Sequence, residues 1–104
     1  MITLTNYLNK SLETLTSDEK RVLWESSVQD QAENMRSEIS VAIKEARLHE
    51  GLTQTQLSEH TGIPQSELSR LEQGKANPTL ETLAKLYVTL GISHRTYFKD
   101  SQLN

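Results

Sequence analysis

Apolar residues recur at helical spacing through the middle of the chain, and the polar residues between them mark where helices begin and end. Residues 52–74 are expected to form two short helices joined by a tight turn. Thr53 can cap the first helix, and Gln56 can complete a capping box with it. Gly62 suits the left-handed conformation that ends a helix. Pro64 suits the start of the next helix, because its missing N–H is not needed there.

The second of these helices has a narrow apolar stripe, formed by Leu68 and Leu71. Most of its other side chains are types that hydrogen-bond to base edges in DNA, where Gln pairs with adenine and Arg with guanine. Taken alone, such a face is typical of an ordinary solvent-exposed helix surface, but the surrounding pattern favours DNA recognition. The polar face consists of Gln65, Ser66, Glu67, Ser69, Arg70 and Gln73.

Further helices are expected on both sides of this pair. The preceding helix should carry Ile39, Ile43 and Ala46 on one face and end near Gly51. The following helix should begin after the cap residue Thr79, and Ser93 should cap a last one, which makes five helices in an all-α domain. The core stripe expected on the helix after Thr79 consists of Leu80, Leu83, Ala84, Tyr87 and Leu90.

The pattern from residue 39 to residue 92 resembles the Xre family of helix-turn-helix domains, to which the lambdoid phage repressors belong. Ser58 departs from the family, which usually has Ala there, but Ser is small enough for close helix packing. The resemblance implies a five-helix lambda-repressor-like fold, in which Arg47 and Glu72 form a partly buried ion pair. The residues that carry the resemblance are Arg47, the run Gly-Leu-Thr-Gln at 51–54, Leu57, Gly62, Leu68, Leu71, Glu72, Gly74, Pro78 and Ile92.

The resemblance also predicts how DNA would be held. The face from Gln65 to Arg70 would lie in the major groove, while residues at the two ends of the helix pair would hold phosphates. The chain is expected to bind a palindromic operator as a homodimer. Tyr97 and Phe98 are either dimer contacts or part of the core, and the two alternatives are about equally favoured. The predicted DNA-binding residues are Gln54, Gln65, Ser66, Glu67, Ser69, Arg70, Lys75 and Asn77.

The first 35 residues differ in character from the rest and are expected to form an arm, with the domain spanning residues 36–104. Apolar and polar residues alternate from Ile2 to Tyr7, which is typical of a strand. Thr16 and Glu19 favour a helix start, and that helix should run to about Val28. Residues 28–37 could be a linker or the early turns of a long helix. The arm has too little apolar surface to offset its ordering entropy, so it should be disordered when free.

Composition narrows the class of protein. The chain has 104 residues, no Cys and a formal net charge of −3. The whole of this net charge lies in residues 1–35, because basic and acidic residues balance in residues 36–104. His49, His60 and His94 have no metal-ligand spacing, and no catalytic motif or cofactor-binding loop is present, so the chain is expected not to be an enzyme. No apolar run approaches the roughly 18 residues of a membrane span, and a cytoplasmic location fits.

Two functions remain in competition, with a more distant third. The first is an antitoxin resembling the HigA group, whose arm would neutralise a basic, mRNA-cleaving toxin of the RelE fold while the domain represses its own operon. The second is a free-standing Xre-type repressor without a toxin partner. The third is an interaction adaptor that has lost DNA binding. Trp24 is either a packing residue or an interface anchor, and the predicted toxin contacts are Ile2, Leu4, Tyr7, Leu8, Leu12, Leu15, Val22, Leu23 and Trp24.

Overall fold

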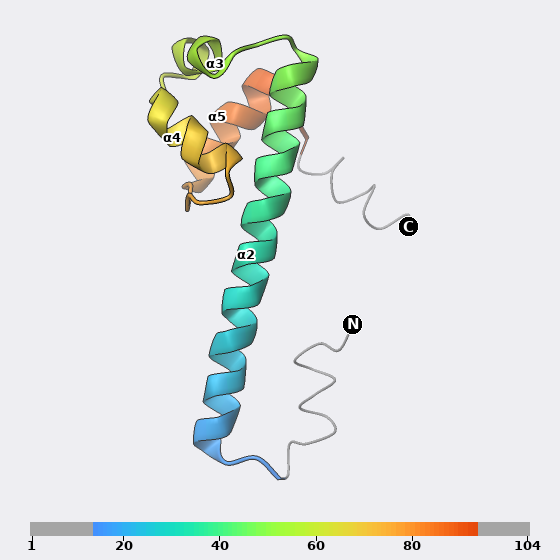
Figure 1. The fold of residues 1–104 in the computed structure, drawn as a ribbon, viewed down its shortest axis with the longest axis vertical. Coiled ribbons are helices and arrows are strands. Elements are labelled where there is room, and N and C mark those ends of the chain that lie inside the picture. Colours follow the sequence, from blue (N-terminus) through green and yellow to red (C-terminus); the bar gives the residue numbers. More distant parts are fainter. Residues whose placement is uncertain (1–13, 94–104) are drawn as a thin grey trace. The chain divides into compact units, whose positions relative to one another are not determined.

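The structure is a computed structural model of the chain, and it describes residues 14–93. These residues form four α-helices and no strand (Figure 1). The helices are α2 (Ser17–His49), α3 (Gln54–Thr61), α4 (Gln65–Glu72) and α5 (Leu80–Leu90). Contacts divide the chain into two units, Met1–Met35 and Arg36–Asn104. The all-α helix-turn-helix fold expected from the sequence is therefore present. The expected last helix, with Tyr97 and Phe98, lies outside the described residues.

Helix α2 is much longer than the sequence pattern predicted. It begins where expected, because the Thr16 hydroxyl accepts from the Glu19 N–H (3.1 Å) and the Glu19 carboxylate accepts from the Thr16 N–H (3.3 Å). The predicted end near Val28 is wrong, and of the two alternatives for residues 28–37 the early turns of a long helix are the ones present. No Gly or Pro interrupts residues 17–49, so no residue there favours a break.

The core lies within the second unit and draws residues from all four helices. Ile43 of α2, Leu57 of α3 and Leu86 of α5 are fully buried, and α3 packs against both α4 and α5. Partly buried residues such as Ile39 and Tyr87 pack around this cluster. Within residues 14–93, the buried hydrophobic residues of this cluster are Ile43, Leu57, Ile63, Leu68, Leu71, Leu86 and Leu90.

Helix α3 begins and ends as predicted, because its signals are local. Thr53 and Gln56 form both hydrogen bonds of a capping box at the start of α3 (3.0 and 2.9 Å). Gly62 ends α3 in the left-handed conformation, with φ of 76°. The Ser58 hydroxyl donates to the Ile63 carbonyl oxygen (2.6 Å), so this departure from the family pattern ties α3 to the turn.

Helix α5 buries a different line of residues from the one expected. The predicted stripe is wrong at Leu80, which is 85% exposed, and at Ala84, which is also exposed. Leu86, which the prediction left out, is fully buried beside Leu90. Apolar residues occur on more than one side of α5, and the packing of α2 and α3 decides which side faces the core.

Candidate DNA-binding surface

A buried ion pair fixes the geometry beneath α4. The Arg47 guanidinium donates to both carboxylate oxygens of Glu72, at 2.7 and 2.9 Å, and donates to the Leu52 carbonyl at 2.7 Å. The Arg47 side chain is 10% exposed and the Glu72 side chain 4%. Hydrogen bonding to Glu72 raises the pKa of Arg47 against the opposing effect of burial, so the guanidinium stays charged. The structure thus joins the end of α2 to the end of α4.

A chain of hydrogen bonds extends this pair to the first residue of α4. The Gln54 amide donates to Glu72 (3.3 Å), and the Gln65 amide donates in turn to the Gln54 side-chain oxygen (2.8 Å). Because Glu72 is held by Arg47, this relay restrains the rotamers of both glutamines. Gln65 is exposed at the N-terminus of α4, so a restrained amide is presented to solvent there.

The remaining predicted DNA-contacting residues of α4 differ in exposure. Ser66 and Arg70 are exposed, while Glu67 and Ser69 are partly buried. The Ser69 hydroxyl accepts from the Gln73 amide (3.1 Å), so Ser69 already has a partner within the helix. Gln65, Ser66 and Arg70 are therefore the α4 side chains most available to a base edge.

Two arginines, Arg70 of α4 and Arg36 of α2, donate hydrogen bonds to the loop after α4, which itself carries Lys75. Arg70 donates to the Lys75 carbonyl oxygen (3.3 Å), which draws its guanidinium toward this loop. The side-chain oxygen of Asn77, a residue predicted to hold phosphate, accepts from Arg36 of α2 (2.9 Å). Arg36 was missed because it belongs to no motif and lies 41 residues from its partner in sequence.

Gly74 brings the loop close to α2. It has φ of +72°, and a Cβ atom at this position would lie 3.8 Å from the Ser40 hydroxyl oxygen and 4.0 Å from the Arg36 carbonyl oxygen. A residue with a side chain would be strained at this φ. The glycine therefore holds Lys75 and Asn77 beside the α2 turn that carries Arg36.

Comparison with known proteins agrees with this geometry. Residues 43–97, more than half of the chain, match the helix-turn-helix family. The chain belongs to the Xre-type helix-turn-helix family. It is therefore a DNA-binding transcriptional regulator, and the prediction that it is not an enzyme is confirmed by its family.

Xre-type relatives occur in several bacteria. An uncharacterized HTH-type transcriptional regulator, y4dJ, of Sinorhizobium fredii is 39% identical over 61 residues, which cover 59% of this chain and 79% of the relative. Another from Haemophilus influenzae is 39% identical over 72 residues, covering 65% and 74%. The HTH-type transcriptional regulator PuuR of Escherichia coli is 33% identical over 60 residues, covering 58% of this chain but 32% of PuuR. No solved structure gives a significant match.

These relatives support the regulator and give no support to the antitoxin, since their names describe transcriptional regulators only. Within residues 14–93 no cluster of His, Asp or Glu is arranged to hold a metal ion. The same part of the chain contains no helix long and apolar enough to cross a membrane.

Proposed function

We propose that the chain is a free-standing Xre-type repressor that binds a palindromic operator as a homodimer, with α4 in the major groove. The observation that carries this proposal is the restrained, exposed Gln65 at the start of α4, beside the cationic loop that follows the helix. Such a helix start can reach base edges, while flanking cations hold the backbone of the duplex.

Base recognition would rest on Gln65, Ser66 and Arg70. The hydrogen bond to Gln54 uses one N–H of the Gln65 amide, which leaves the carbonyl oxygen and the other N–H for the N6 and N7 edge of adenine. Arg70 uses one of its five N–H donors on the Lys75 carbonyl. That exposed bond is worth only about 1 kcal/mol, so Arg70 can leave it for the O6 and N7 atoms of guanine.

Phosphate binding would rest on Arg36, Lys75 and the N-terminus of α3 at Gln54. Residues 36–104 carry eight basic and eight acidic groups, so the unit offers no general attraction to DNA. Few phosphates can be neutralised by one copy, and affinity then depends on two copies binding together. A two-fold dimer would place its α4 helices about one helical turn, or ~34 Å, apart along the duplex.

A direct test starts from a duplex selected out of a random-sequence pool by the full chain. Gln65→Ala should weaken binding to that duplex by roughly 5- to 150-fold in fluorescence anisotropy, because a bidentate base contact contributes about 1–3 kcal/mol of discrimination. Binding to random DNA should hardly change. The matched control is Gln31→Ala, which removes the same side chain from an exposed position of α2. Equal losses on selected and random DNA would contradict base recognition by Gln65.

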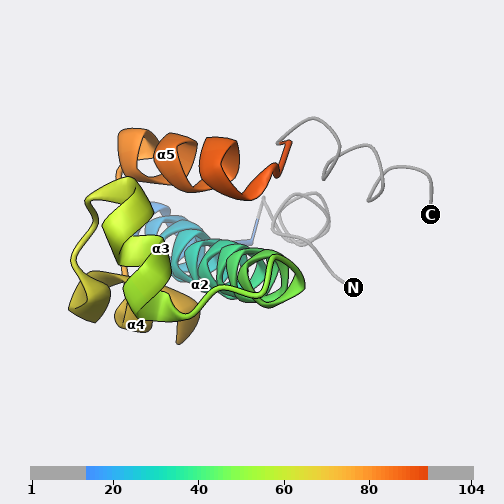
Figure 2. The ribbon, with the colours of Figure 1, turned by 90° about the horizontal axis from the view of Figure 1, so that it is seen from above.

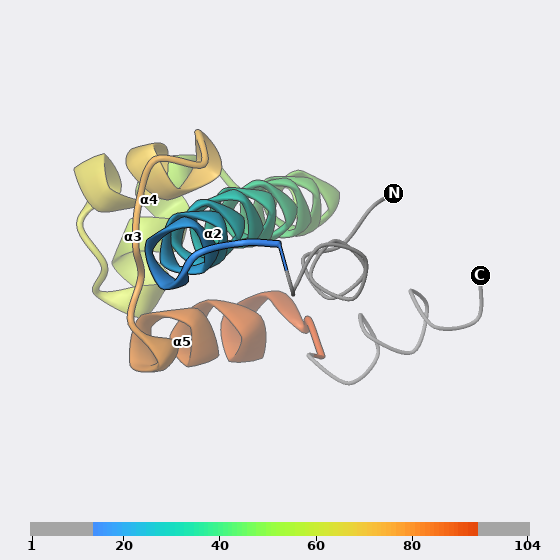
Figure 3. The ribbon, with the colours of Figure 1, turned by 90° about the horizontal axis from the view of Figure 1, so that it is seen from below.

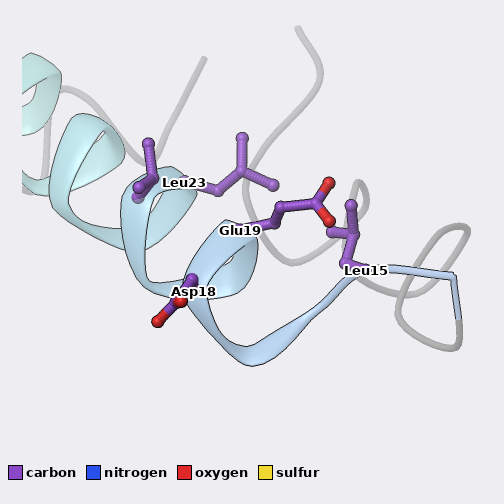
Figure 4. Close-up of a pocket in the computed structure, with 5 residues that line it drawn as sticks. Leu15, Asp18, Glu19 and Leu23 are labelled. Atoms are coloured by element: carbon purple, nitrogen blue, oxygen red, sulfur yellow. The ribbon is translucent and has the colours of Figure 1, made fainter.

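A second candidate function, the antitoxin, rests on the first part of α2. Leu15, Val22 and Leu23 line a shallow groove beside acidic side chains, and Glu19 points toward Leu15 while Asp18 points away (Figure 4). Trp24, on the same part of α2, is 58% exposed. Residues 1–35 together have a net charge of −3. An acidic surface with apolar anchors is complementary to a basic protein such as a RelE-fold ribonuclease. The predicted contacts Ile2, Leu4, Tyr7, Leu8 and Leu12 lie outside the described residues.

This candidate is tested by coexpression with the product of any adjacent small, basic reading frame. If the chain is an antitoxin, Trp24→Ala should weaken the complex by about 30-fold, as expected for a hot spot of about 2 kcal/mol, and cells should stop growing. Gln29→Ala, an exposed change on the same stretch of α2, should leave neutralisation intact. Unimpaired neutralisation by the Trp24 variant, or no toxicity of the neighbour, would leave only the free-standing regulator.

A further inference from the structure

The hydroxyl of Ser58 in α3 holds the turn that leads to α4. It donates to the Ile63 carbonyl oxygen at 2.6 Å. A Ser inside a helix can instead donate to the carbonyl oxygen one turn back, so this hydroxyl serves the turn and not its own helix. The carbonyl oxygen of Ser58 also accepts from the Gly62 N–H (2.8 Å). Ser58 therefore contacts the turn through both its side chain and its main chain.

The main chain of Ile63 is held on both sides by hydroxyl groups of α3. Its carbonyl oxygen accepts from Ser58, and its N–H donates to the Thr61 hydroxyl (3.2 Å), which donates in turn to the Leu57 carbonyl oxygen (2.8 Å). The Ile63 side chain is buried in the core. The residue immediately before Pro64 is therefore fixed by its side chain and by both of its main-chain polar groups.

The direction of α4 is set within this short turn. Figures 2 and 3 show α3 and α4 side by side from opposite directions, and only residues 62–64 separate the two helices. The Ile63 carbonyl group and the Pro64 nitrogen belong to one planar peptide unit. The ring of Pro64 fixes the next torsion, φ, at −55°. Once the Ser58 hydroxyl holds the peptide plane, the ψ torsion of Pro64 is the one rotation left before the helix.

The start of α4 is fastened to Pro64 and has no side-chain cap of its own. The N-cap residues of α3 and α5, Thr53 and Thr79, each accept a helix N–H through their hydroxyls, but the ring of Pro64 has no group that could do so. In α4 the N–H groups of Glu67 and Leu68 both donate to the Pro64 carbonyl oxygen (3.0 Å each). The first turn of α4 therefore follows Pro64, whose own orientation depends on the peptide plane that Ser58 holds.

We infer that Ser58 is a positioning residue for DNA recognition, because its hydroxyl fixes the direction in which α4 leaves the turn. Hydrogen bonds to base edges require side chains placed to within about 0.5 Å, whereas long cationic side chains reach phosphates over a wider range. The Ser58 hydroxyl should therefore contribute to discrimination between sequences and hardly to general affinity for DNA. This inference rests on the proposed function, in which α4 reads base edges.

Ser58 and the Gln54–Gln65 hydrogen bond restrain different parts of α4. The bond from Gln65 to Gln54 (2.8 Å) orients one side chain. The bond from Ser58 orients the main chain ahead of the helix, and so acts on Gln65, Ser66 and Arg70 together. Loss of the Ser58 hydroxyl should thus relax the sequence preference at several base positions, whereas loss of the Gln65 amide should relax it at one.

The first experiment compares the affinity of the full chain for its selected duplex with its affinity for random DNA. Ser58→Ala should lower this ratio by about fivefold, the factor that one net hydrogen bond contributes, with affinity for random DNA unchanged. Ser40→Ala is the matched control, because its hydroxyl also donates to a backbone carbonyl, that of Ser37 (2.8 Å), but within α2. A purely structural role would lower thermal stability in either variant and leave the ratio intact at a temperature where both are folded.

The wild-type chain and the Gln65→Ala variant separate this inference from the proposed function. If the wild-type chain binds all sequences alike, the proposed function fails and the inference fails with it. If the wild-type chain discriminates and Gln65→Ala lowers the ratio while Ser58→Ala does not, only the inference is overturned. A second selection from the random pool with Ser58→Ala should show relaxed preference at several positions, and relaxation at one position alone would also overturn it.

The second experiment measures the position of α4 without DNA, by amide hydrogen exchange of the full chain. Ser58→Ala should speed exchange of the Glu67 and Leu68 amides by about fivefold, because the first turn of α4 loses its restraint. The Gln73 amide, which donates to carbonyl oxygens at the other end of α4 (3.2 Å), should keep its rate. Equal acceleration at both ends would show a general loss of stability and would overturn the inference, as would unchanged rates at both ends.

Discussion

The two parts of α2 share one helix but differ in what holds them. Between residues 17 and 35 no side chain is fully buried, and the apolar residues Val22, Trp24 and Met35 are exposed. Between residues 36 and 49, Ser40, Ile43 and Arg47 are buried. Tertiary packing stabilises the second part, while the first depends on its capping box, its intrinsic helix propensity and weak pairs such as Arg21 with Asp18 (3.5 Å).

The comparison shows that helix length and helix stability have separate causes. Residues 17–35 contain good helix formers and no breaker, so they extend α2. Helical residues without buried contacts open at a low free energy, whereas buried ones open only with the whole domain. The prediction that residues 1–35 are disordered in the free chain stays a prediction, and the same contrast provides its test.

Amide hydrogen exchange should give the largest contrast. Amides near Ile43 and Arg47 should exchange only through global unfolding, which costs about 5 kcal/mol or more, while those from Val22 to Val28 should open almost freely. Protection factors in the two parts should therefore differ by at least about a thousandfold. Equal protection along α2 would mean that the first part is also packed on a surface. It would contradict the view that tertiary packing stabilises only the second part.

Breaking the buried ion pair should give the next largest effect. Glu72→Ala leaves the Arg47 charge without its partner, and such losses cost about 3–5 kcal/mol of unfolding free energy. The exposed pair gives the matched control, since Asp18→Ala should cost less than ~1 kcal/mol. Urea unfolding measures both.

The raised pKa of Arg47 means that this stabilisation is present at every pH below its unfolded pKa and is lost only as the pH rises through the folded value. The Glu72 effect should thus stay constant between pH 6 and 9, and a marked fall in that range would contradict the assignment.

Truncating one apolar residue in each part of α2 sharpens the comparison. Ile43→Ala should lower the unfolding free energy by about 2–5 kcal/mol, because it removes a fully buried side chain from the core. Val22→Ala should change it by less than ~0.5 kcal/mol, since that side chain is exposed. Chemical denaturation followed by circular dichroism checks both variants. A large cost at Val22 would show that its groove is filled in the free chain.

The smallest expected effect is on DNA affinity, which should depend on an arginine in the second part of α2 but not on one in the first part. Arg36→Ala should weaken binding to all sequences alike and lower the slope of log K against log salt by about one unit, because one phosphate contact is lost. Arg21→Ala removes the same charge from the first part of α2 and should leave the slope unchanged. Salt titrations of anisotropy measure both. A sequence-selective loss at Arg36 would place its guanidinium on a base instead.

Local signals in the sequence determined the helix-turn-helix unit. Thr53, Gln56 and Gly62 form caps within a few residues of one another, so their pattern alone predicts the bounds of α3. Thr79 and Gly91 do the same for α5. The bidentate contact between Arg47 and Glu72 followed from a family resemblance, because no local rule joins residues 25 positions apart.

Only the tertiary structure decided which sides of the helices are buried. An apolar arc of about 200° on α5 allows either Leu80 or Leu86 to face inward, and the periodicity of one helix does not choose between them. The choice depends on where α2 and α3 lie, as does the contact of Arg36 with Asn77 across the loop. Capping is decided by neighbours along the chain, so it can be read from the sequence. Burial is decided by neighbours in space, and those are known only once the helices have packed.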